Sequence, residues 1–240
     1  MIIHGKNPIE EALNAGGAGI EKIYIYKGVT NNALVEKIKK SGIQYQFTDK
    51  AAIDRIAKTG GHQGFVATVA DYKYFGITEM IESAYAKGSQ PVILILDGVE
   101  DPHNLGNIIR TAECMGVDGI VIPKNRSVAV TETVVRVSAG SAIHMKVSKV
   151  TNISTEIEYL KEQGFWVYAA TMGGTNIAQT NLQGPIAIIM GGEHTGVRHQ
   201  TKANSDGIIS IPMKGKINSL NVANATAMVL YEVNRQRYLK

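Results

Sequence analysis

The chain has 240 residues, 44% of them hydrophobic and 19% charged, with a formal net charge of +4 and a pI near 9.0. These values are ordinary for a soluble globular protein, and they permit an anionic partner such as RNA without demonstrating one. The sequence has one cysteine, no cluster with zinc spacing and no apolar run of the roughly 20 residues that a membrane span needs. We therefore expect a cytoplasmic protein that binds neither membrane nor metal.

The first seventy residues alternate between short helices and strands. Asn7 and Asp49 suit helix N-caps, and Glu10 stands three residues after Asn7, which is the capping-box distance. Residues 1–72 are therefore predicted to form a small α/β domain. Its expected helices run from Asn7 to Gly16-Gly17, over Asn31–Lys40 and from Asp49 to Lys58, and its expected strands are Lys22–Tyr26, Ile43–Phe47 and Phe65–Ala70.

Residues 73–90 are more polar, apart from a helical stretch near Ile77–Lys87, and are interpreted as a linker. From residue 91 to residue 240 the chain shows short apolar runs without alternation, typical of strands buried on both faces of a parallel sheet. The runs are Val92–Leu96, Gly119–Ile122, Phe165–Ala170, Ile186–Met190 and Ile208–Ile211, and helices are expected over Leu105–Met115, Thr131–Ala139, Ser154–Gln163 and Ser219–Arg237.

Ligands of open α/β sheets bind beyond the carboxyl ends of the strands, which directs attention to the loops after these runs. The first such loop enters a helix that carries Arg110 among apolar residues. Asp101-Pro102 suits a turn and Asn104 suits the helix N-cap, so a structural role explains those residues. Arg110 is harder to explain in this way.

Two later loops are also unusual. Met190–Arg198 (MGGEHTGVR) has paired glycines that let the backbone approach a ligand, yet it is neither a dinucleotide fingerprint nor a P-loop. In the third loop Ser219 precedes the final helix and could be only its cap. Asn221 and Asn224 are polar residues on that mostly apolar helix, and they need partners if they are buried.

Together the three segments closely resemble the signature motifs of the SpoU (TrmH-like) family of SPOUT RNA methyltransferases. The matching stretches are DGVEDPHNLGNIIRTAECMGVDGIVIP, IAIIMGGEHTGVR and ISIPMKGKINSLNVANATAMVLYEVNRQR. The start of the chain (IIHGKNPIEEAL) and HQGFVA at His62–Ala67 are similar to the substrate-binding domain of one branch, which holds 23S ribosomal RNA guanosine-2′-O-methyltransferases and thiostrepton-resistance enzymes. PHNLGN and VSAGSA (Val137–Ala142) favour the former.

The resemblance implies an α/β fold with a small N-terminal α/β substrate-binding domain and a C-terminal parallel-sheet SPOUT domain that contains a trefoil knot. The knot would form the pocket for S-adenosylmethionine, and the family works as a homodimer with active sites near the subunit interface. Asn224 departs from the family pattern, since many relatives have a small or apolar residue there. By motif, the cofactor contacts fall on Gly191, Ile211 and Leu220, and the catalytic site on Asn104, Arg110, Glu193, Ser219 and Asn221.

The implied reaction moves a methyl group from S-adenosylmethionine to a ribose 2′-hydroxyl of 23S ribosomal RNA, at a guanosine. Proposals for the family make the arginine of the first motif, here Arg110, the general base. Arginine is effectively always protonated, so an electrostatic anchor for a phosphate or a developing alkoxide is the more conservative role. His103 is left out of the catalytic set, because a turn histidine beside proline is more often structural or in contact with RNA.

Three alternatives stay open: a tRNA ribose 2′-O-methyltransferase, an adenosine-directed resistance-type enzyme, and a non-catalytic RNA-binding assembly factor. The additional N-terminal domain argues against the first, and the intact motif residues argue against the last. In that domain Tyr24, Tyr26, Tyr45 and Lys22 are available to contact RNA, although tyrosines on alternating strands are usually half buried.

Overall fold

The computed structural model describes residues 1–17, 19–87, 90–193, 195–217 and 219–238. Its contacts divide the chain into two compact units, Met1–Lys73 with Val130–His144, and Tyr74–Ala129 with Met145–Lys240. Residues 130–144 thus pack with the first unit, although they lie within the predicted 91–240 domain. Gly88 and Ser89 of the predicted linker, and His194 and Asn218 of the motifs, lie outside the described residues. Within the described ranges no helix is long and apolar enough to cross a membrane.

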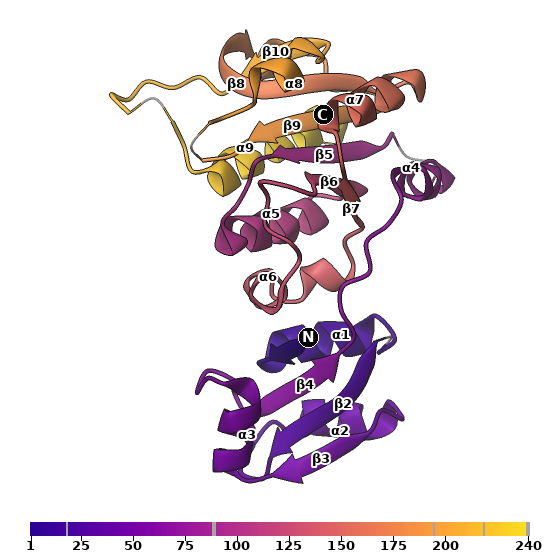
Figure 1. Cartoon of the computed structure of the whole chain (residues 1–240), viewed down its shortest axis with the longest axis vertical. Coiled ribbons are helices and arrows are strands. Elements are labelled where there is room, and N and C mark those ends of the chain that lie inside the picture. Colours follow the sequence, from indigo (N-terminus) through magenta and orange to yellow (C-terminus); the bar gives the residue numbers. More distant parts are fainter. Residues whose placement is uncertain (18, 88–89, 194, 218, 239–240) are drawn as a thin grey trace. The chain divides into compact units, whose positions relative to one another are not determined.

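The first unit is built on a four-stranded sheet with strand order β1-β4-β2-β3 (Figure 1). β4 is antiparallel to β1 and β2, and β3 joins β2 in parallel. One face of β2 buries Ile23 and Ile25 completely, while Tyr24 and Tyr26 on the other face pack with residues of α3. The elements are β1 (Ile2–His4), α1 (Lys6–Asn14), β2 (Ile20–Tyr26), α2 (Asn32–Lys40), β3 (Tyr45–Thr48), α3 (Lys50–Ala57) and β4 (Phe65–Val69), with α6 (Glu132–Val137) and η1 (Ser141–Ile143) from the second segment.

Most elements of this unit follow the predictions. As predicted, Asp49 caps α3, and its Oδ1 accepts a hydrogen bond from the backbone N–H of Ala52 at 2.8 Å. Two features differ from the predictions. The prediction that Asn7 caps α1 is wrong, because the helix already begins at Lys6 after Gly5, whose φ of +99° a side chain would disfavour. β1 was not expected, since three residues are too few to show an alternating pattern.

The second unit is built on a six-stranded sheet with order β10-β8-β9-β5-β6-β7, and every strand pair in it is parallel. This confirms the predicted parallel-sheet domain; the trefoil knot stays a prediction. β7 and the short helix α8 (His199–Ala203) were not expected from the sequence. The strands are β5 (Val92–Asp97), β6 (Gly119–Pro123), β7 (Val147–Val150), β8 (Trp166–Asn176), β9 (Ile186–Gly191) and β10 (Gly207–Ser210).

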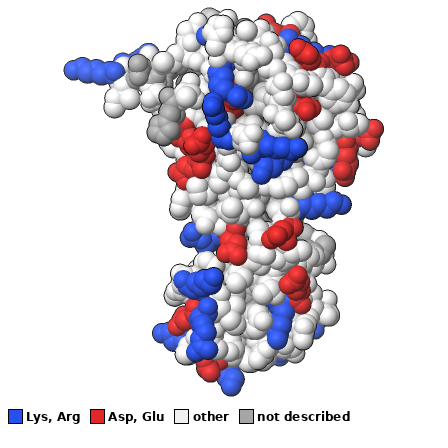
Figure 2. All heavy atoms as spheres, viewed as in Figure 1, with Lys and Arg blue, Asp and Glu red and all other residues white. Residues whose placement is uncertain are grey.

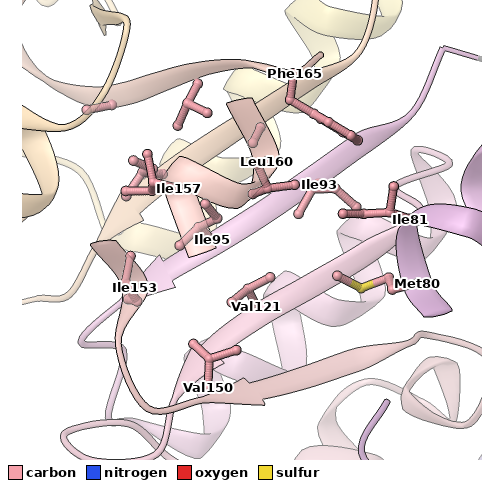
Figure 3. Close-up of a cluster of buried hydrophobic side chains, with 14 residues drawn as sticks. Met80, Ile81, Ile93, Ile95, Val121, Val150, Ile153, Ile157, Leu160 and Phe165 are labelled. Carbon is pink, nitrogen blue, oxygen red and sulfur yellow. The ribbon is translucent and has the colours of Figure 1, made fainter. Parts of the chain in front are cut away.

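Helices cover both faces of this sheet, which explains why its strands are apolar without alternation. Figure 3 shows one face, where side chains of β5 and β6 such as Ile93 and Val121 meet Met80 of α4 (Ile77–Ala86) and Leu160 of α7 (Ile153–Glu162). The intervening residues Leu94, Ile120 and Ile188 are equally buried and belong to the opposite face. There α5 (Pro102–Cys114) and α9 (Val222–Tyr238) pack against each other.

The start of α5 differs from the prediction that Asn104 is its N-cap. Asp101 holds that position, and its Oδ1 accepts from the backbone N–H of His103 at 2.8 Å. Pro102 is the first helical residue, which suits its fixed φ and missing N–H. Asn104 therefore lies inside the first turn, buried, with its amide free to serve another segment.

The start of α9 also lies later than predicted. The helix begins at Val222 rather than at Ser219, and the Oδ1 of Asn221 accepts from the backbone N–H of Ala223 at 2.9 Å. Asn221 is thus the capping side chain, and the alternative that Ser219 caps the helix is wrong. Asn224, the residue that departs from the family pattern, is exposed, so it does not need a buried partner.

Candidate active site

A cavity of about 740 Å³ lies at the carboxyl ends of β8 and β9 and beside the segments after β10. Both backbone and side chains of these segments line it, and the lining is mixed polar and apolar. A cavity of this size can hold a nucleoside-sized cofactor. Its walls include Thr171, Met172, Met190, Gly191, Gly192, Glu193, Ile211, Met213, Ser219, Leu220 and Asn221.

Two glycines at the end of β9 are required by the close approach of three backbone segments. A Cβ on Gly191 would collide with the backbone of Gly196 and Val197, and a Cβ on Gly192 would collide with the carbonyl of Gly98. Gly192 also donates its N–H to the carbonyl of Asp97 at 2.9 Å and accepts from the N–H of Gly196 at 3.0 Å. The paired glycines therefore shape this wall of the cavity by allowing backbone segments to pack closely, and the approach to a ligand stays a prediction.

A chain of side-chain hydrogen bonds connects three of the predicted catalytic residues. Asn221 donates through Nδ2 to the Oδ1 of Asn104 at 2.9 Å, and Asn104 in turn donates through Nδ2 to Glu193. Because the Oδ1 of Asn221 is already used in capping α9, its Nδ2 must face Asn104. That fixes the orientation of the Asn104 amide as well, so its N–H points at the Glu193 carboxylate. The network joins the start of α5, the loop after β9 and the start of α9.

A buried ion pair that the sequence analysis did not single out holds the same loop. Asp97, with none of its surface exposed, accepts from Nε of Arg198 at 2.6 Å and from the backbone N–H of Arg198 at 3.0 Å. The signal was present, because a carboxylate that directly ends a fully apolar strand needs a partner when buried. Arg198 thereby ties the end of the 191–198 loop to the end of β5.

Arg110 is the one predicted catalytic residue that this chain brings neither to the cavity wall nor into the hydrogen-bond network beside it. It is exposed on α5, it does not line the cavity, and no hydrogen bond or ion pair to it is found among the described residues. Six residues separate it from Asn104, which rotates it by about 240° around the helix, away from the face that carries Asn104. Asn104 itself reaches the site only through Glu193 and Asn221.

The remaining predicted residues lie where the motifs placed them. Gly191, Ile211 and Leu220, predicted to bind the cofactor, all line the cavity, as do Glu193 and Ser219. The absence of a Cβ at Gly191 lets the backbone of Gly196 and Val197 pack directly against it, so this part of the cavity wall is built from main chain. Their roles stay predictions. Among the described residues no group of His, Cys, Asp and Glu could hold a metal ion.

A parallel α/β unit with a nucleoside-sized cavity at the strand ends is typical of enzymes that bind a nucleotide-like cofactor, and comparison with protein families specifies the class. Residues 91–231 match the model of the SpoU rRNA Methylase family, and residues 2–75 match the model for RNA 2′-O ribose methyltransferase substrate binding. The chain belongs to the SpoU family and is an RNA 2′-O-methyltransferase that uses S-adenosylmethionine.

Relatives and solved structures agree with this assignment. A protein of Staphylococcus haemolyticus named as a TrmH family tRNA/rRNA methyltransferase is 39% identical over 99% of this chain and 96% of its own. The SpoU methyltransferase AviRb of Streptomyces viridochromogenes, solved with AdoMet, shares the fold with a TM-score of 0.84 at 20% identity, over 100% of this chain and 91% of its own.

Two further structures differ in how much of the chain they match. An AdoMet-bound rRNA methyltransferase of Sinorhizobium meliloti covers 98% of this chain and 86% of its own, with a TM-score of 0.80 and 23% identity. The TrmH/SpoU tRNA modifying enzyme of A. aeolicus covers 67% of this chain and 84% of its own, with a TM-score of 0.56 and 26% identity.

Replacing Asn104 by aspartate tests the hydrogen-bond network. Asn104→Asp removes the N–H that Glu193 accepts and sets two carboxylates against each other, so we expect activity to fall at least tenfold and stability at pH 7 to fall by about 1 kcal/mol. The folded variant would hold a shared proton more tightly than the unfolded chain, whose carboxyls titrate near pH 4. The stability deficit should therefore be full at pH 7 and shrink as the pH falls toward 4, as measured by urea unfolding.

Asn32→Asp is the matched control, because Asn32 is exposed on α2, far in sequence from the predicted catalytic residues. It makes the same chemical change without facing Glu193, so its activity and stability should stay near those of the wild type. Equal effects of the two substitutions would show that the Asn104 amide is not needed for the network.

Proposed function

We propose that this enzyme methylates the ribose 2′-hydroxyl of a guanosine in 23S ribosomal RNA and that it acts in the cytoplasm as a homodimer. The observation that carries the choice of ribosomal RNA is the substrate-binding match at residues 2–75, next to the catalytic match. The rRNA methyltransferase of Sinorhizobium meliloti matches nearly the whole chain, whereas the tRNA modifying enzyme matches only 67% of it. A target in tRNA is the second candidate, because the relatives carry both names.

The cavity would hold S-adenosylmethionine against the backbone of Gly191, Ile211 and Leu220. When bound, this cofactor supplies an electrophilic methyl group. The residues of the chain then have to place a ribose hydroxyl in line with that methyl group and stabilise the loss of its proton. Glu193, held by Asn104, and Ser219 at the cavity wall are the polar side chains positioned to orient the ribose.

Arg110 fits the role of an electrostatic anchor better than that of a base, because a guanidinium stays protonated and can bind a phosphate or a developing alkoxide. Since Arg110 is exposed and does not line the cavity of its own chain, we infer that it serves the cavity of a second copy. Met228 and Tyr231, 49% and 53% exposed and three residues apart on α9, give this unit an apolar helix face that a second copy would cover.

The test is methylation of 23S and tRNA transcripts with labelled S-adenosylmethionine, followed by mapping of the 2′-O-methyl positions. Label at one guanosine of the 23S transcript supports the proposal. Label confined to tRNA would sink the ribosomal assignment, and label at an adenosine would identify a resistance-type enzyme. Cofactor-dependent thermal stabilisation without label in either transcript would mean that neither naked transcript is the substrate. A Glu193→Ala variant provides the catalytic control.

A further inference from the structure

The free edge of the sheet in the first unit carries two exposed aromatic side chains. Tyr45 and Phe47 occupy alternate positions of β3, so their side chains lie on the same face. They are 39% and 41% exposed, with ring centroids 6.0 Å apart and ring planes at 89°. β3 is the last strand of the described sheet and pairs only with β2 there, so its outer side is open.

Core packing does not account for this exposure. Tyr45 and Phe47 pair in register with Ile23 and Ile25 of β2, which are completely buried on that face. The core on this face is therefore already covered, and a large part of each ring is not needed to shield it from solvent. The other strand tyrosines differ, because Tyr24 and Tyr26 pack with the residues of α3 on the opposite face. Of the residues that sequence alone suggested for RNA contact, Tyr45 is the exposed aromatic.

Positive charge lies beside the two rings. Lys37, Lys39 and Lys40 form the last turn of α2, and the chain passes directly from there to β3. A hydrogen bond to Glu36 at 2.7 Å and the charge of that carboxylate raise the pKa of Lys39, so Lys39 remains a cation. Residues 1–73 hold ten Lys and Arg against seven Asp and Glu. On the face of this unit that Figure 2 shows, Lys and Arg side chains are interspersed with Asp and Glu.

We propose that Tyr45 and Phe47, with the lysines at the end of α2, form a stacking site for bases of a single-stranded segment of the RNA substrate. Every base has a π face, so two exposed rings on one face of a strand can each hold a base, while the ammonium groups attract the phosphates. The proposal rests on the proposed function in that the ligand is the RNA to be methylated. Within that function, the proposal assigns to the β3 edge the binding of an RNA segment that lies next to the methylated nucleotide.

An open strand edge can also pair with a strand of another protein. Such pairing uses the backbone of β3 and does not depend on aromatic rings at Tyr45 and Phe47. The lysines beside the edge and the positive charge of residues 1–73 favour the polyanion. The two occupants are separated by variants that keep apolar bulk but remove the aromatic rings.

The variants are Tyr45→Leu with Phe47→Leu, and, as the matched control, Tyr45→Phe with Phe47→Tyr. The full-length chain is titrated with a fluorescein-labelled single-stranded RNA of about 12 nucleotides. We expect the leucine pair to weaken binding by at least fivefold per ring, about 25-fold in all, and the swapped aromatics to stay within about twofold of wild type. Binding by the leucine pair within twofold of wild type overturns the proposal, as does equal weakening in both variants.

Salt dependence separates the rings from the charges. Lys39→Gln with Lys40→Gln should lower the slope of log affinity against log salt by about 0.7 per lysine. The leucine pair should shift the affinity at all salt concentrations without changing that slope. A slope unaffected by loss of both lysines contradicts their part in the site.

Photocrosslinking of the wild type avoids dependence on any variant that fails to fold. Trypsin releases residues 41–50 (SGIQYQFTDK) as one peptide that contains both rings. Irradiation of the complex with the same RNA should attach nucleotide to this peptide, and a crosslink map without it overturns the proposal. Methyl mapping reports the proposed function separately, so a wrong target nucleotide leaves this result intact, and a failed stacking site leaves the methylation result intact.

Discussion

Replacing Arg110 by alanine is expected to lower kcat by about 10²–10³ while the affinity for S-adenosylmethionine stays unchanged. In its proposed role Arg110 supplies positive charge where negative charge develops, whereas the cavity proposed to hold the cofactor is lined by other segments. Arg110→Lys keeps a cation and should recover part of the loss. Single-turnover rates and calorimetric titration of the cofactor measure the two quantities separately.

The exposed position of Arg110 gives this prediction a second part, which concerns two copies of the chain. Arg110→Ala and Glu193→Ala should each be inactive, yet mixing them should restore about a quarter of wild-type activity after subunit exchange. Half of the dimers would then be mixed, and each mixed dimer would hold one site in which both side chains are intact. If Arg110 served its own cavity, every mixed site would lack one of the two groups and no activity would return.

The fold was largely predictable because its signals are local. Apolar runs without alternation identified strands buried on both faces, and capping residues such as Asp49 marked helix starts. The failures occurred where two residues could serve one local role. At the start of α5 both Asp101 and Asn104 suit the N-cap, and Asp101 takes it. At the start of α9 both Ser219 and Asn221 suit it, and Asn221 takes it.

The site was predictable only in part, because its geometry depends on segments far apart in the chain. Asn104 and Asn221 are 117 residues apart in sequence, and no periodicity indicates that their amides meet. Asp97 and Arg198, 101 residues apart, were missed for the same reason. The motifs named Asn104 and Asn221 through resemblance, and the structure supplies the reason they act together, which is the single orientation that capping imposes on both amides.

The paired glycines lead to the second large effect, because any side chain at Gly191 or Gly192 must displace backbone. Gly192→Ala places a methyl group against the carbonyl of Gly98, and Gly191→Ala places one against the backbone of Gly196 and Val197. A backbone obstacle cannot rotate away as a side chain does. We expect a displacement on the order of 1 Å, which costs about 10²-fold in kcat/KM, together with a loss of about 1–3 kcal/mol in stability.

Cofactor titration and thermal unfolding measure the two parts of this effect. Each variant should bind S-adenosylmethionine at least tenfold more weakly, since Gly191, Gly192 and Gly196 line the cavity, and each should melt several degrees lower. Gly60→Ala is the control for the substitution itself, because an added Cβ there meets nothing within 4 Å. Wild-type cofactor affinity in Gly192→Ala would mean that the loop after β9 does not form the cofactor wall, and the binding role predicted for Gly191 would fall with it.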